Sequence, residues 1–104
     1  MKKNNLYQGL PPQIPKEIFE TLAENDNVRI QRIISDDHTS PPGFWYDQEE
    51  SEWVLILDGA AKIEYFDESE VSLNVGDALL IPPRTKHRVI YTAPRTIWLA
   101  VHFS

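Results

Sequence analysis

The chain contains no cysteine. It therefore has no disulfide bond, no thiolate zinc site and no cysteine nucleophile, and the absence fits a cytoplasmic protein. Long apolar runs are missing as well, since "WVLIL" and "ALLIPP" are far too short to span a bilayer. The N-terminal "MKKNNLYQGLPPQIP" begins with basic residues but lacks the apolar region of a signal peptide. We therefore expect a cytoplasmic protein with no membrane partner.

Positive charge is scarce, with 10 lysines and arginines against 16 aspartates and glutamates, for a net charge of -6. Nucleic-acid binding needs clustered basic side chains, so we expect no nucleic-acid partner. The length of 104 residues fits one domain, and an apolar content of 41% is ordinary for a globular protein. A domain this small buries limited surface by itself, so we expect a homodimer.

The first part of the chain, residues 1–27, is predicted to pack on the outside of the remainder. Its polar, proline-rich beginning predicts an extended arm. Pro15 then suits the first turn of a helix, and Ile18, Phe19 and Leu22 form an apolar stripe. We therefore expect a short helix, or a helical turn, within "PKEIFETLAEND".

The remainder, residues 28–104, has the pattern of an all-β barrel. Its strand-like runs are separated by turns at intervals of about eight to twelve residues. Asp58-Gly59 is a strong hairpin signal between two of them. No helix is expected between strands, which disfavours a parallel sheet and favours a closed antiparallel barrel or a double-sheet jelly roll. The runs are "VRIQRIIS", "EWVLIL", "AAKIEYFD", "EVSLNV", "ALLIPP", "KHRVIYT" and "TIWLAVHFS".

Two motifs resemble those of small single-domain cupins. The second cupin motif has a glycine, five residues, a proline, one residue, a glycine, two residues and a histidine. Here Gly76, Pro82 and His87 keep this spacing, and Arg84 replaces the second glycine. The first motif ends in a glutamate, six residues and a glycine, which the segment from Glu52 through "WVLILD" to the next glycine matches. The resemblance covers roughly residues 28 to 103 and implies a double-stranded β-helix, or jelly-roll, barrel.

The first motif departs from the family where the family has His-x-His. With a three-residue gap before the glutamate the two positions hold Tyr46 and Gln48, and with a four-residue gap they hold Trp45 and Asp47. Both histidines are missing in either alignment. Tyr91 stands where the second motif has its downstream asparagine.

The resemblance implies a divalent metal, Zn, Fe, Mn or Ni, held by His87 and Glu52. Imidazole and carboxylate hold such ions well, and Gln48 or Asp47 could complete three ligands. Gln48 shares strand parity with Glu52, but the loop "QEES" can break that parity, so both stay open. On the last run Trp98, Ala100 and His102 point to one side. We favour His102 hydrogen-bonding within its strand or at a dimer edge, with a fourth metal ligand or polar wall residue as the alternative.

The aromatic segment "GFWYD" indicates either core and dimer packing or a pocket with aromatic walls. In the pocket interpretation Tyr46 and Glu52 would move protons. The pocket would be lined by Trp45, Tyr46, Gln48, Arg84, Tyr91 and Trp98. The function that this implies is a cupin binding a metal and a small organic ligand, as a metal-dependent oxygenase or isomerase. The alternatives are a metal-free binding or sensing module, and a dimeric structural or interaction protein with a relict site.

Overall fold

The computed structural model describes residues 3–104 and consists of strands, turns and loops. The described residues contain no helix, and thus none that is long and apolar enough to cross a membrane. The strands are β1 (Ile18–Glu24), β2 (Val28–Ser35), β3 (Ser51–Asp58), β4 (Ala60–Tyr65), β5 (Glu70–Asn74), β6 (Ala78–Ile81), β7 (His87–Thr92) and β8 (Thr96–Phe103).

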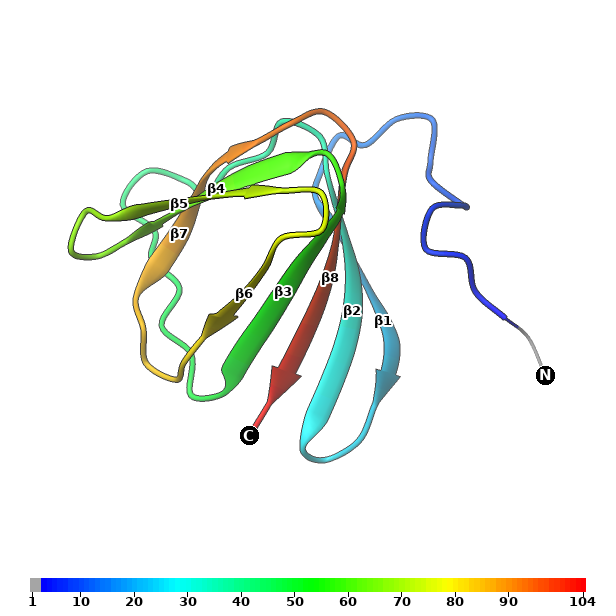
Figure 1. The fold of residues 1–104 in the computed structure, drawn as a ribbon. Helices are drawn as coiled ribbons and strands as arrows, with labels where there is room; N and C mark the ends of the chain where they lie inside the picture. Colours follow the sequence, from blue (N-terminus) through cyan, green and yellow to red (C-terminus); the bar gives the residue numbers. More distant parts are fainter. Residues whose placement is uncertain (1–2) are drawn as a thin grey trace.

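These strands form two antiparallel sheets (Figure 1). One sheet has five strands in the order β1-β2-β8-β3-β6, and the other has three in the order β5-β4-β7. Strands from β3 onward switch repeatedly between the sheets, so neighbours in space are rarely neighbours in sequence. The predicted all-β, double-sheet architecture is confirmed.

The predicted helix in "PKEIFETLAEND" is wrong, because the structure has strand β1 in its place. β1 pairs with β2 from Ile18 opposite Ile34 to Glu24 opposite Arg29, with a bulge after Thr21. A seven-residue segment is too short to be a stable helix on its own. The free backbone groups along β2 offer hydrogen bonds that a helix on the outside would leave unmade. Pairing with β2 therefore outweighs the helical spacing of the apolar side chains.

The Asp58-Gly59 turn does not close a hairpin. β3 pairs with β6 and β8, whereas β4 pairs with β5 and β7, so the chain passes here from one sheet to the other. Gly59 has φ +86°, and its N–H donates to the Asp58 side chain at 2.9 Å. The dipeptide makes the tight turn that its sequence predicts, but the flanking strands diverge because each has better-matched partners elsewhere.

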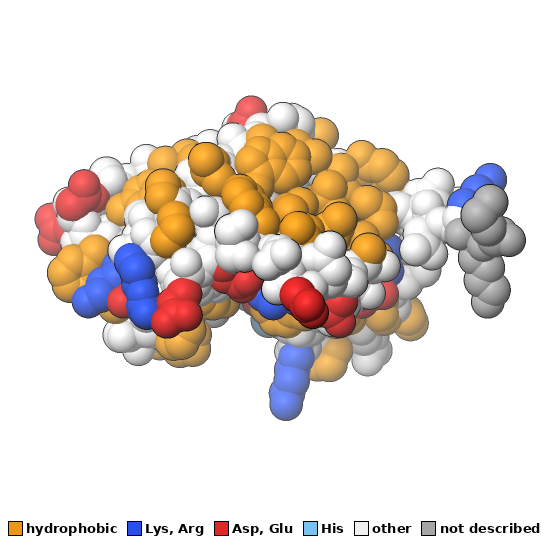
Figure 2. All heavy atoms as spheres, turned by 90° about the horizontal axis from the view of Figure 1, so that it is seen from below, with side chains coloured by type: hydrophobic (Ala, Val, Ile, Leu, Met, Phe, Trp, Pro, Cys, Tyr) orange, Lys and Arg blue, Asp and Glu red, His pale blue; other side chains and the backbone are white. Residues whose placement is uncertain are grey.

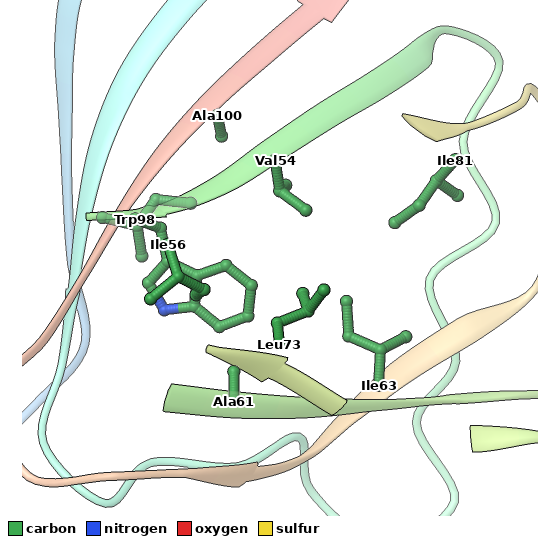
Figure 3. Packing of buried hydrophobic residues seen from close by; sticks show 9 residues of the cluster. Val54, Ile56, Ala61, Ile63, Leu73, Ile81, Trp98 and Ala100 are labelled. Carbon is green, nitrogen blue, oxygen red and sulfur yellow. The ribbon is translucent and has the colours of Figure 1, made fainter. Parts of the chain in front are cut away.

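The core lies between the two sheets and consists of apolar side chains from both (Figure 3). Trp98 of β8 is its largest member, and its indole Nε1 donates to Ser35 Oγ at 3.1 Å. Burying this ring with its polar atom satisfied stabilises the sandwich without an unpaired donor. The members of this core are Ile33, Val54, Ile56, Ala61, Ile63, Leu73, Ile81, Trp98 and Ala100.

The N-terminal arm is held against the five-stranded sheet by a buried arginine. Arg32 is 6% exposed; it contacts Glu20 at 2.6 Å and donates to the backbone carbonyls of Leu6 and Gln8 at 3.2 and 2.6 Å. Burying a guanidinium is costly unless its donors are satisfied, and here carboxylate and carbonyl oxygens satisfy them. The predicted extended arm is therefore anchored by polar contacts.

Several large apolar side chains remain exposed. Figure 2 shows hydrophobic side chains gathered in a broad patch on one side of the molecule. Phe19 on edge strand β1 is 53% exposed, and Leu80 on edge strand β6 is 54% exposed. Exposed apolar surface at sheet edges is compatible with the homodimer predicted from the sequence, which stays a prediction.

Candidate functional site: a histidine and carboxylate centre in the cavity between the sheets

A cavity of about 240 Å³ opens between the sheets, next to the hydrophobic core. Its wall combines apolar side chains with a small number of convergent polar ones, which is typical of small-molecule sites. The lining residues are Glu17, Phe19, Arg29, Gln31, Ile33, Tyr46, Gln48, Glu52, Val54, Ile63, Ile81, His87, Val89, Trp98 and His102.

His87 enters this cavity from the first position of β7. Its backbone forms an isolated bridge with Tyr46, in which each residue's N–H donates to the other's carbonyl, at 2.8 and 3.1 Å. The two rings stack with centroids 5.3 Å apart and an interplanar angle of 22°. The loop that carries Tyr46 is thereby attached to the strand that carries His87, which holds both side chains at the cavity wall.

The two nitrogens of His87 have different partners. Nδ1 lies 2.7 Å from the Thr85 carbonyl, to which it donates, and Nε2 lies 3.4 Å from Oε1 of Glu52. Burial by itself lowers the pKa of His87, but the Glu52 carboxylate and the Thr85 carbonyl favour the protonated ring, so that its pKa is raised above the ordinary 6.5. The carboxylate and imidazole thus form a buried acid–base pair that faces the cavity.

His102 reaches the same carboxylate from β8. It is opposite Glu52 in the β3–β8 register, and its Nε2 lies 3.5 Å from Oε2 of Glu52. Its Nδ1 lies 3.6 Å from Glu50 and has no hydrogen-bond partner, although the residue is only 5% exposed. The side chain of His102 lines the cavity and, among the described residues, makes no hydrogen bond within its strand, which leaves one buried nitrogen unpaired. A role of His102 at a dimer edge stays a prediction.

Two imidazoles and a carboxylate are donors that divalent first-row metals accept. Among residues 3–104, however, no group of three or more His, Cys, Asp or Glu side chains is arranged to hold a metal ion. Glu52 presents a different oxygen to each ring, Oε1 to His87 and Oε2 to His102, instead of directing one oxygen toward a point shared by both. As placed, these side chains do not fit a metal shell, and the chemistry derived below does not pass through a metal.

Of the other predicted site residues, Tyr46, Gln48 and Trp98 line the cavity. Asp47 does not, since its carboxylate lies 3.5 Å from Arg84 on the outside of the loop. Gln48 therefore takes the inward position, although the chain bends at residues 49–50 and Glu50, which has the same parity, does not line the cavity.

The predicted pocket residues Trp45, Arg84 and Tyr91 are not part of the cavity wall. Trp45 packs against Phe66, with centroids 5.1 Å apart, and under the Arg88 guanidinium. Arg84 is exposed and pairs with acidic side chains of the neighbouring loop, and Tyr91 is 45% exposed on the outer side of β7. Only Trp45 follows simple alternation, since the next residue, Tyr46, faces inward. Arg84 lies in a turn and not in a strand. Tyr91 has the parity of the inward Val89, but the β4–β7 register shifts between these two residues.

The sequence analysis missed Glu17, Arg29 and Gln31, all of which line the cavity. Glu17 was missed because its segment was interpreted as the start of an external helix. The other two lie on β2, where they alternate with Arg32 and share the inward side with Ile33. That alternation was visible, but only the sheet pairing shows which side of β2 faces the cavity.

The sequence model of the cupin domain matches residues 36–102. The chain belongs to the cupin family. This cupin keeps the glutamate of the first motif and the histidine of the second, and the fold brings them together as Glu52 and His87. No curated protein matches the sequence closely enough to count as a relative.

Several solved structures resemble this one over 90% or more of its length. A protein of Ralstonia eutropha JMP134 with the name "putative mannose-6-phosphate isomerase" has 42% identity and a TM-score of 0.94, covering 100% of this chain and 99% of that one. A cupin superfamily protein of Desulfitobacterium hafniense DCB-2 has 21% identity and a TM-score of 0.77, covering 90% and 83%. KdgF from a Halomonas species has 17% identity and a TM-score of 0.76, covering 96% and 91%. The last two show the shared fold alone.

Proposed function

We propose that this cupin binds a small polar organic molecule in the cavity and isomerises it by proton transfer. The observation that carries the proposal is the buried pair formed by His87 and Glu52, which faces a cavity of about 240 Å³. Proton transfer needs a base and an acid within reach of the same substrate atoms, and this pair supplies both. The isomerase name of the Ralstonia eutropha relative supports the same class of reaction.

The chemistry is that of converting a hydroxy-aldehyde into a hydroxy-ketone. The Glu52 carboxylate takes the proton from the carbon next to the carbonyl, while His87 donates its Nε2 proton to the carbonyl oxygen, which gives an enediol. The enediol then loses the proton of its other hydroxyl to His87 and gains a carbon-bound proton from Glu52. The product is an isomer of the substrate, so the cycle needs no oxidant or reductant.

Tyr46 completes this centre. Burial raises the pKa of its hydroxyl above the usual range, and the nearby Glu17 and Glu52 carboxylates raise it further. The hydroxyl therefore stays protonated at neutral pH and can donate a hydrogen bond to a substrate oxygen. Its ring, stacked on His87, limits the rotation of the imidazole.

Deuterium exchange tests the proposal. Purified protein would be incubated in D₂O with a panel of aldoses and aldose phosphates, and followed by proton NMR. We expect the signal of the proton on the carbon next to the carbonyl to disappear and the signals of the ketose to appear. His87→Gln should abolish exchange, whereas His38→Gln, which removes an imidazole that does not line the cavity, should retain it. Absence of exchange with every compound would contradict the proposed reaction. Binding without exchange would instead favour the metal-free binding or sensing module.

A divalent metal site is a second candidate, favoured by one observation. Nδ1 of His87 donates to a backbone carbonyl, and this is the outer contact that commonly orients a metal-binding imidazole. His87, Glu52 and His102 could become ligands only if Glu52 turned one oxygen toward both imidazoles, since as placed they do not form a metal shell. Gln48 lies in the same wall, and Zn, Fe, Mn or Ni are the candidate ions. The oxygenase alternative depends on this site.

Elemental analysis tests the metal candidate. The protein would be purified without a His tag or chelator, alongside His87→Ala and the control His38→Ala. Near-stoichiometric metal that is lost only in His87→Ala would support a metal centre. If neither the purified protein nor protein reconstituted with each of the four ions retains metal, the metal candidate is excluded.

A further inference from the structure

The cavity contains a carboxylate that the proposed reaction does not use. Glu17, just before β1, lines the cavity wall and accepts a hydrogen bond from the Ser35 hydroxyl. Ser35 is fully buried and in turn accepts the Trp98 indole N–H at 3.1 Å. This chain of hydrogen bonds runs from the core to Glu17 and fixes the position of its carboxylate, while one carboxylate oxygen remains for a ligand.

Among the described residues of the cavity wall, Glu17 is the carboxylate without a cationic partner, because Glu52 is paired with His87. Glu17 and Glu52 are both close enough to Tyr46 to raise the pKa of its hydroxyl, after the larger effect of burial. The one arginine in the wall, Arg29, is already paired with Glu50 at 2.9 Å, and the wall contains no lysine. Within residues 3–104, the cavity therefore offers an anionic ligand no unpaired Lys or Arg side chain.

The remaining polar groups suit hydroxyl groups. The ring of His102 lines the cavity with Nε2 3.5 Å from Glu52, whereas its unpartnered Nδ1 lies 3.6 Å from Glu50, which is not part of the cavity wall. Gln31 and Gln48 add amide donors and acceptors, and Tyr46 adds a donor. The volume of about 240 Å³ corresponds to roughly eight water molecules and lies below the range of pockets for drug-sized ligands. A monosaccharide is of a suitable size and polarity.

We infer that the cavity takes a neutral, unphosphorylated polyhydroxy compound of monosaccharide size, with Glu17 accepting hydrogen bonds from its hydroxyl groups and repelling phosphate esters. This inference rests on the proposed function and narrows its substrate class. The inferred ligand is unphosphorylated, whereas the name of the Ralstonia eutropha relative refers to a phosphorylated sugar. A phosphate dianion in the cavity would face the Glu17 carboxylate, which has no cationic partner, and would find no free Lys or Arg side chain to bind it.

Paired titrations test the inference. Isothermal titration calorimetry would compare mannose, fructose and xylose with mannose 6-phosphate and fructose 6-phosphate. We expect at least one neutral sugar to bind about tenfold or more tightly than its phosphate ester. Glu17→Gln, which keeps an oxygen for the Ser35 hydroxyl, should reduce that preference by about tenfold through tighter binding of the ester. Glu24→Gln removes an exposed charge outside the cavity and should leave the preference unchanged.

Tighter binding of either phosphate ester than of its parent sugar would overturn the inference, as would an unchanged preference in Glu17→Gln or the lack of binding by any neutral sugar. Failure of the proposed isomerase activity has a different signature. In that case neutral sugars bind with the expected preference, but no deuterium exchange follows.

Discussion

Replacing Gly59 with alanine is expected to lower the free energy of unfolding by about 3 kcal/mol. The residue has φ +86°, and a Cβ atom there would lie 2.3 Å from Oγ1 and 2.8 Å from Cα of Thr96. Thr96 cannot retreat, because it is fully buried and its hydroxyl is hydrogen-bonded to the Ala93 carbonyl at 2.7 Å. Since this turn transfers the chain between the sheets, the clash would separate β4 from the start of β8. Urea unfolding followed by tryptophan fluorescence measures the change.

Gly76→Ala is the matched control. Gly76 also has a positive φ, +88°, but a Cβ atom there would meet nothing within 4 Å. The free energy of unfolding of this variant should fall by only about 1 kcal/mol, which is the cost of placing alanine in a left-handed backbone conformation. The difference between the two variants isolates the steric contribution of Thr96. Equal losses in the two variants would contradict the assigned role of the close approach.

Glu52→Gln is expected to reduce the proposed isomerase turnover by about a hundredfold or more and to lower the pKa of His87. Burial lowers this pKa, and the Glu52 carboxylate is the main group that offsets burial. Glutamine has nearly the same shape but no charge, so the effect of burial would dominate. The pKa is measured by NMR titration of the imidazole carbon protons, and turnover by the deuterium-exchange assay.

Glu50→Gln serves as the control, because Glu50 lies next to His102 and Arg29 but has no contact with His87. The pKa of His87 should be unchanged in this variant. A pKa of His87 that falls equally in both variants would show that the general negative charge of the region acts on the ring, and not the Glu52 contact.

The raised pKa of His87 also predicts a pH dependence of stability. The titratable groups that face the ring are Glu52 from β3, the stacked Tyr46 and, through Glu52, His102 from β8. A histidine whose pKa is higher in the folded state than in the unfolded state stabilises the folded protein when it is protonated. This contribution is fully present below the unfolded pKa of about 6.5 and disappears as the pH rises through the folded pKa. The stability advantage of wild type over Glu52→Gln should therefore be largest below about pH 6.5 and shrink above the folded pKa. Urea titrations across this range measure it.

The sequence by itself determined the fold class and part of the centre of the site. Turn residues at regular intervals, alternating strands and the absence of interior helices predicted a double sheet, and the two motifs placed Glu52 and His87 together. Of Gln48 and Asp47, which the sequence left open, Gln48 is the one that lines the cavity. These features depend on spacing along a strand, because side chains alternate with a period of two wherever strand geometry holds.

Tertiary structure alone decided which side of each strand faces the cavity and which remote segments complete it. The segment from Ile18 to Glu24 has the apolar spacing of a helix, yet it forms β1 because β2 offers an unpaired edge. That pairing brings the preceding Glu17 to the cavity wall, and the β3–β8 register brings His102 to Glu52. Contacts between strands far apart in sequence follow from backbone pairing and burial across the whole sandwich. Local residue patterns therefore do not predict them.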